Sequence, residues 1–179
     1  MTSVPRLEPL PAEEWDDDAR SAVSPLLPAE RANARDAGNV VGTLVRNPAL
    51  TRAYLEFNAH LLLRSTVSAR MREVALLRAV HLRRSEYLWD HHVPIAQRAG
   101  LTLVEIDAIR RGQVVEPIDQ LVVRAVDEVE EASTVTDATW SQLREHFDEQ
   151  QMLDLVFTIG CYQVLAVAVN VFGIQPEDH

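Results

Sequence analysis

The stretch SEYLWDHHVPIA, residues 85–96, decides the fold and holds most of the side chains that are capable of chemistry. Ser85 stands where the N-cap of a helix from Glu86 to Ala99 is expected. Residues three and four apart share a helix face, so one stripe of this helix is made by Ser85, Leu88, Trp89 and His92. Pro94 cannot donate a backbone hydrogen bond and predicts a bend beside the two histidines.

Capping residues and apolar spacing predict further helices on both sides of this stretch. Asn47–Pro48 and Ser68 are typical helix starts, Thr102 and Glu105 form a capping box, and Gly112 is a typical helix end. The pattern therefore predicts helices over about 47–63, 69–82, 86–99, 103–111, 117–132, 137–147 and 149–173. Alternating β-type runs are scarce, which indicates an all-α fold of about eight helices.

The first 46 residues are expected to differ from the rest. Pro11 begins a predicted acidic helix over 12–22, and residues 24–46 are expected to form a long connector with at most one helical turn. We expect residues 1–46, as helix and connector, and residues 47–175, as helical core, to make one domain, because 179 residues is an ordinary length for a single domain.

The composition excludes several kinds of partner. The 17 basic residues, all arginines, stand against 27 acidic ones and leave a formal charge of −10, which disfavours nucleic acid and anionic membranes. One cysteine, Cys161, allows neither an internal disulfide nor a CxxC redox centre. The start of the chain does not have the pattern of a secretory signal, so a cytoplasmic location is expected.

The most apolar stretch, residues 152–174, is predicted to be a central helix and not a membrane span. Asp154, Gln163 and Asn170 interrupt it before the roughly 18 apolar residues that a span requires. It is apolar around nearly its whole circumference, which favours burial on all sides and therefore a homo-oligomer.

Several motifs together resemble the carboxymuconolactone decarboxylase family, which has the alkylhydroperoxidase D (AhpD)-like all-helical fold. They are Arg72-Glu73, Leu76-Leu77-Arg78, the stretch 85–96, Ala99-Gly100-Leu101 and Glu105-Ile106, within a similarity that runs from about residue 39 to 174. The resemblance implies homo-oligomers, commonly trimers or hexamers, that act on a carboxylated lactone without a metal or organic cofactor. It also implies that Glu73 and His92 are the acid–base residues.

The peroxidase branch of this superfamily uses a pair of cysteines. The resemblance places its glutamate and histidine at Glu73 and His92, and its two cysteines at Ser85 and Leu88. Because a thiolate is the nucleophile in that chemistry and serine is no equivalent, an antioxidant peroxidase is the disfavoured alternative. A non-catalytic oligomeric binding protein is the third hypothesis.

The decarboxylase hypothesis assigns roles to six residues. His92 would donate or accept the proton with Glu73 as its partner, because imidazole suits proton transfer near neutral pH. The substrate would contact a set made by Tyr87, Trp89, His91 and Ser85. Each of these four also has a plainer interpretation, in packing for the two aromatic residues, at the surface for His91 and as an N-cap for Ser85.

The sequence indicates neither a metal site nor one particular arginine that would bind a substrate carboxylate. No metal site is predicted, because adjacent histidines at 91 and 92 point about 100° apart on a helix and make poor joint ligands. A clamp for a substrate carboxylate is not identified, although the chemistry allows Arg46, Arg78, Arg83 or Arg84.

Overall fold

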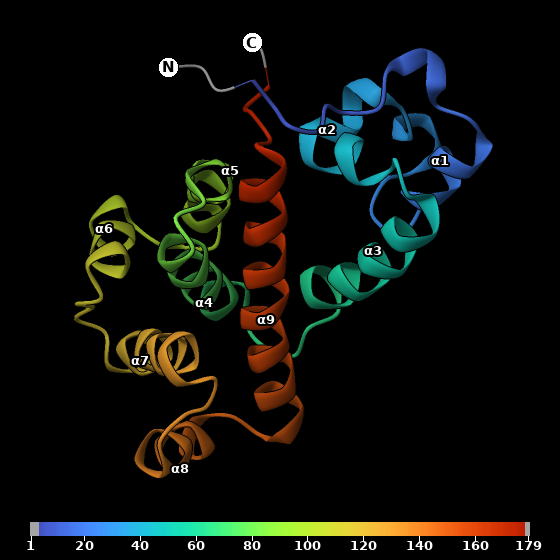
Figure 1. Cartoon of the computed structure of the whole chain (residues 1–179). Coiled ribbons are helices and arrows are strands. Elements are labelled where there is room, and N and C mark those ends of the chain that lie inside the picture. Colours follow the sequence, from blue (N-terminus) through green and yellow to red (C-terminus); the bar gives the residue numbers. More distant parts are fainter. Residues whose placement is uncertain (1–3, 178–179) are drawn as a thin grey trace. The chain divides into compact units, whose positions relative to one another are not determined.

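A computed structural model describes residues 4–177, and over these residues the chain is all-α, as predicted (Figure 1). Its α-helices are α1 (Asp17–Ala22), α2 (Ala34–Leu44), α3 (Pro48–Leu63), α4 (Ala69–Leu82), α5 (Glu86–Arg98), α6 (Leu103–Arg111), α7 (Pro117–Ala132), α8 (Asp137–His146) and α9 (Glu149–Phe172). The chain forms two compact units, one of Met1–Arg64 with Ala168–His179 and the other of Ser65–Val167.

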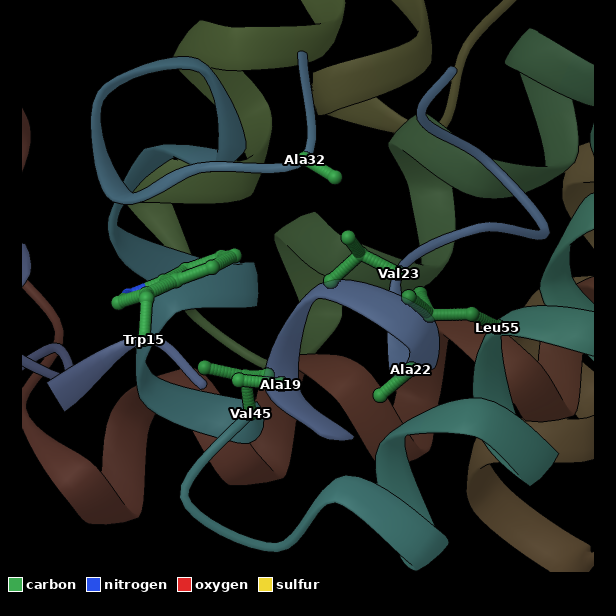
Figure 2. Close-up of a cluster of buried hydrophobic side chains, with 7 residues drawn as sticks. All are labelled: Trp15, Ala19, Ala22, Val23, Ala32, Val45 and Leu55. Atoms are coloured by element: carbon green, nitrogen blue, oxygen red, sulfur yellow. The ribbon is translucent and has the colours of Figure 1, made fainter. Parts of the chain in front are cut away.

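The first unit is built around a buried tryptophan. Helices α1 and α2 pack on α3, and an apolar cluster gathers Trp15, Ala19, Ala22, Val23, Ala32, Val45 and Leu55 (Figure 2). The Trp15 indole Nε1 donates a hydrogen bond of 3.1 Å to the Leu10 carbonyl, so burial leaves its polar atom satisfied.

The predicted helix over 12–22 is wrong, because this buried tryptophan divides it. A short 3-10 turn (Ala12–Glu14) ends at Trp15, whose backbone is extended. Asp16 then caps a new helix, α1, by accepting a hydrogen bond of 2.8 Å from the Ala19 N–H. Seating the indole in the core thus outweighs the local preference for one continuous helix.

The expected connector over 24–46 is also wrong in part, since it contains the whole of α2. Asn33 caps α2 by accepting from the Asp36 N–H at 3.0 Å. Gly38 interrupts it with a φ of 70° and a ψ of 173°, a left-handed conformation that favours glycine. This kink breaks the helical periodicity that would have revealed the helix in the sequence.

The second unit is organised around α4. This helix packs on α5, α6 and α7, and the chain then adds α8 against α7 (Figure 1). Eight residues of α4 are buried, including the charged Glu73. The predicted starts of α3 at Asn47, α4 at Ser68 and α6 at Thr102 are confirmed by side-chain caps, and α6 ends at Gly112 in the left-handed conformation.

Helix α9 is the long apolar helix that the sequence predicts. Its most apolar window has a mean hydropathy of 2.0, which together with its length would allow a membrane span. One such helix is weak support for a span, because core helices pass the same test. Here the Asp154 carboxylate is buried and accepts hydrogen bonds from the Thr66 N–H at 2.6 Å and the Thr66 hydroxyl at 2.8 Å, as expected of a helix packed in protein.

The capping box of α6 should make stability depend on pH. Hydrogen bonds from the backbone N–H of Thr102, from the guanidinium of Arg70 and from the Thr102 hydroxyl lower the pKa of Glu105 to about 2. The ionised carboxylate therefore stabilises the fold above its ordinary pKa, and this contribution is lost as the pH falls from about 4.5 towards 2. We expect Glu105→Gln to lower the free energy of unfolding at pH 7 more than at pH 3, as measured by urea denaturation.

Glu145→Gln is the matched control, because Glu145 is exposed and lies outside such a network. It should change the free energy of unfolding by a similar small amount at both pH values. A deficit of Glu105→Gln that is the same at pH 7 and pH 3 would contradict the role of the ionised carboxylate.

Candidate active site

A buried carboxylate and a buried histidine face each other between α4 and α5. The Glu73 side chain is 0% exposed and the His92 side chain is 7% exposed. Glu73 Oε2 lies 3.0 Å from Nδ1 of His92, which is a hydrogen-bond distance. The structure thus joins the two acid–base residues that the family resemblance implies, although 19 positions separate them in the sequence.

This contact determines which histidine nitrogen is available. When Nδ1 donates to Glu73, the neutral ring carries its lone pair on Nε2. When the ring is protonated, Nε2 carries a second N–H and the carboxylate balances the charge. Nε2 can therefore accept or donate a proton while Nδ1 stays bonded.

Tyr162 of α9 packs against the histidine from a third helix. The two ring centroids are 5.1 Å apart and the rings are nearly perpendicular, at 87°. Tyr162 is 2% exposed, so a buried aromatic edge-to-face contact helps to hold the imidazole in place. Sequence reasoning missed this residue, because one tyrosine in an apolar helix is also the pattern of ordinary packing.

Arg72 lies beside the other oxygen of the carboxylate. Its Nε is 3.7 Å from Glu73 Oε1, close enough for an ion pair and too far for a hydrogen bond. Both atoms are buried and lack a hydrogen-bond partner among the described residues. The carboxylate is therefore neutralised on one side by arginine and bonded on the other by histidine.

Ser85 does not make the cap that the sequence predicts. It occupies the N-cap position of α5, yet its side chain accepts no hydrogen bond from the first turn. Its ψ of 83° departs from the extended value near 160° seen at Thr102, which does cap α6. The Ser85 hydroxyl is buried and has no hydrogen-bond partner in the described part of the chain.

The other predicted substrate contacts fall into two places. Tyr87 and His91 stack with ring centroids 6.4 Å apart, and His91 contacts His92 edge to face at 5.6 Å. Trp89 is only 6% exposed, with the Arg110 guanidinium 4.5 Å above its ring. Tyr87 and His91 thus form a row of aromatic rings that reaches the Glu73–His92 pair through His92. Trp89 is instead packed among other side chains of its unit.

Two other features of the second unit bear on binding. Residues 4–177 contain no group of three or more histidine, cysteine, aspartate or glutamate side chains placed to hold a metal ion. An open groove of about 860 Å³ lies between α7, α8 and the loop before α7, with Val115, Arg124 and His146 in its lining. Neither Glu73 nor His92 lines this groove, so the acid–base pair is a separate feature.

The fold of the chain is similar to that of several solved structures. A peroxidase-related protein from Ralstonia eutropha with an alkylhydroperoxidase AhpD core shares 20% identity, at a TM-score of 0.78 over 98% of this chain and 95% of that one. A peroxidase-related protein from a Silicibacter species shares 15% identity, at a TM-score of 0.73 over 98% and 90%. A protein of unknown function from Agrobacterium tumefaciens, named for the antioxidant defence protein AhpD, shares 21% identity, at 0.65 over 75% and 94%.

These likenesses establish the fold as an AhpD-like all-α fold. The model of the carboxymuconolactone decarboxylase family matches residues 48–131, which include both Glu73 and His92. This segment is thus similar to the carboxymuconolactone decarboxylase family, as the resemblance implied. None of the curated proteins matches the chain.

The unsatisfied hydroxyl of Ser85 leads to a stability prediction. Ser85→Ala removes no hydrogen bond, so we expect the free energy of unfolding to stay within about 0.5 kcal/mol of the wild type or to rise. Thr102→Ala is the matched control, because it removes a cap that accepts from the Glu105 N–H and should cost about 1 kcal/mol. Urea denaturation measures both, and a loss at Ser85 as large as that at Thr102 would show a cap at both positions.

Proposed function

We propose that the protein is a cofactor-independent enzyme of the carboxymuconolactone decarboxylase type, which transfers a proton at a carbon of a carboxylated lactone or a similar acid. The observation that carries the proposal is the buried hydrogen bond of 3.0 Å between Glu73 and His92. A buried carboxylate that orients one imidazole nitrogen and leaves the other available is an arrangement suited to general acid–base catalysis.

The proposed reaction needs a proton donor and a stabilised anion. The bond between a ring carbon and its carboxylate breaks, CO₂ leaves, and the electron pair remains in the β,γ-unsaturated lactone as a dienolate. Nε2 of protonated His92 then gives its proton to carbon, the C–H bond forms, and the neutral ring regains a proton from solvent. Throughout these steps Glu73 holds Nδ1 and balances the charge of the protonated ring.

The main alternative is the antioxidant activity that the names of the structural relatives mention. Thiol chemistry of that kind would need two cysteines near His92, and the corresponding positions are Ser85 and Leu88. Cys161 is the only thiol in the chain and is buried in α9. A lone cysteine cannot form the internal disulfide of a dithiol cycle, which is why we favour the acid–base function.

Turnover by site variants tests the proposal. We expect the wild type to convert at least one member of a panel of carboxylated lactones and β-keto acids, followed by CO₂ release or by NMR. His92→Gln and Glu73→Gln should each lower kcat by roughly 100-fold or more, because general acid–base groups contribute about that much.

His146→Gln is the matched control, since this histidine is exposed on α8 and its replacement should leave kcat unchanged. Equal rates for the wild type and His92→Gln would remove His92 from the mechanism. Reduction of a peroxide by a dithiol, abolished by Cys161→Ser, would support the antioxidant alternative. Binding without any turnover would favour the non-catalytic alternative.

We also propose that the chain forms a homo-oligomer, a trimer or hexamer as the resemblance implies. Along α9 the spacing of Leu153, Val156, Val164 and Val167 places four apolar side chains on one face. Each of them is at least 45% exposed. An apolar stripe of this kind on a soluble protein is typical of a surface that another chain covers.

Size-exclusion chromatography with light scattering tests self-association. We expect the wild type to be oligomeric and Val164→Glu to shift it towards the monomer, because a charge in the stripe would have to lose its hydration on burial. Val104→Glu, an equally exposed valine on α6 and outside the stripe, should leave the mass unchanged. A monomeric wild type at micromolar concentration would contradict the proposal.

A further inference from the structure

A substrate acid needs a cationic group close to the proton-transferring histidine. Arginine is the residue best suited to bind a carboxylate, because its planar guanidinium offers five N–H donors and can form two parallel hydrogen bonds. The question is which arginine of the second unit has donors that the fold itself does not use.

Most arginines around α4 are already bonded. Arg78 donates to the Asp127 carboxylate at 2.6 and 3.1 Å and to the carbonyls of Ile109 and Arg110 at 3.1 and 2.8 Å. Arg70 donates to the carboxylates of Glu105 and Asp119 at 2.7 and 2.6 Å. These side chains join helices, so a ligand could recruit them only by breaking the bonds that hold the unit together.

The remaining arginines named from the sequence are also poorly placed. Arg83 lies 3.0 Å from the Glu130 carboxylate, and Arg84 is exposed beyond the end of α4. Arg46 belongs to the other unit, where it donates to the Glu8 and Pro9 carbonyls.

Arg72 differs from these arginines both in its hydrogen bonding and in its position. Its side chain is only 14% exposed, yet it makes no hydrogen bond to any residue that the structure describes, and its one charged neighbour is Glu73 at 3.7 Å. Donors that are taken out of water without a partner cost free energy. The buried Nε of Arg72 is such a donor, and it lies beside the acid–base pair, where a bound anion could accept from it.

The carboxylate of Glu73 links this guanidinium to the histidine. Oε1 faces Arg72 and Oε2 is bonded to His92, so the two groups lie on either side of one carboxylate. An anion bound by Arg72 and the imidazole of His92 would therefore both be neighbours of the Glu73 carboxylate. The negative charge of Glu73 would repel such an anion if Arg72 did not offset it.

We propose that Arg72 binds a carboxylate that the substrate keeps throughout the reaction, an assignment that rests on the proposed function. The departing carboxylate is a poor candidate, because a cation bound to it would stabilise the ground state and slow the loss of CO₂. Contact with a retained carboxylate is equally strong in the ground state and the transition state. Loss of Arg72 should thus raise KM and leave kcat nearly unchanged.

Binding of an unreactive probe tests Arg72 without any turnover. The probe is the saturated γ-lactone (5-oxotetrahydrofuran-2-yl)acetate, whose carboxylate stands on a side chain and not on a ring carbon, compared with its methyl ester and measured by calorimetry or ligand-observed NMR. We expect the wild type to bind the acid at least tenfold more tightly than the ester. Arg72→Gln should weaken binding of the acid by roughly 10- to 100-fold and leave that of the ester unchanged.

Three further variants make the result specific. Arg98→Gln removes the same charge from an exposed position at the end of α5 and should keep the preference for the acid. His92→Gln should keep it too, because the proton-transferring residue is not the anion site. Arg72→Lys keeps the positive charge but cannot form two parallel hydrogen bonds, so it should recover part of the preference for the acid. Its thermal unfolding midpoint reports whether the fold is intact.

The outcomes separate this assignment from the proposed function. Acid binding that depends on Arg72, together with no turnover of the panel, would support the anion site and contradict only the proposed enzymatic function. Turnover with an unchanged KM in Arg72→Gln, or with kcat lowered as much as kcat/KM, would contradict the Arg72 assignment and leave the proposed enzymatic function supported. A wild type that does not distinguish the acid from the ester would also overturn it.

Discussion

The buried negative charge of Glu73 is the constraint on which the second unit depends. A carboxylate removed from water is tolerated only when charges or hydrogen bonds replace its hydration. Here the replacement comes from Arg72 on the same helix and from His92 on α5. Helix α5 therefore has to lie along α4 in the one register that brings His92 to Glu73. The contact that pairs the two helices is also the contact that orients the imidazole.

Two other arginines of α4, one on either side of Glu73, tie this helix to α6 and α7. Arg70 reaches the capping box of α6 and the buried Asp119 of α7, and Arg78, about two turns further along α4, reaches Asp127 of α7 and the last carbonyls of α6. Both ends of α4 are thus tied to the same two helices by charge-assisted hydrogen bonds. Arg72 makes no hydrogen bond of this kind to another helix that the structure describes, which is why the proposal assigns its guanidinium to a ligand.

Local signals explain how much could be predicted from the sequence. Helices α3, α4 and α6 begin at the caps Asn47, Ser68 and Thr102, where one side chain bonds a backbone N–H three residues away, so a few neighbouring residues are enough to predict each start. The division at Trp15 depends on burial, and the kink at Gly38 depends on a backbone angle. Neither can be predicted from a short stretch of sequence. The same holds for the site. The family resemblance pointed to Glu73 and His92, whereas the contact of Tyr162 and the unbonded state of Arg72 and Ser85 arise only when distant segments pack.

The residues at the two cysteine positions of the peroxidase branch change what the shared pair can act upon. In a dithiol enzyme a neighbouring base serves to form the thiolate that attacks. Ser85 is buried and unbonded and Leu88 is only 3% exposed, so neither position offers a thiol to the pair. An apolar side chain at position 88 also lowers the local polarity, which strengthens the electrostatic coupling of the glutamate and the histidine. On the proposed function, the proton that the pair would have taken from a thiol is exchanged with the carbon of the ligand, and the fold needs no other alteration to change its chemistry.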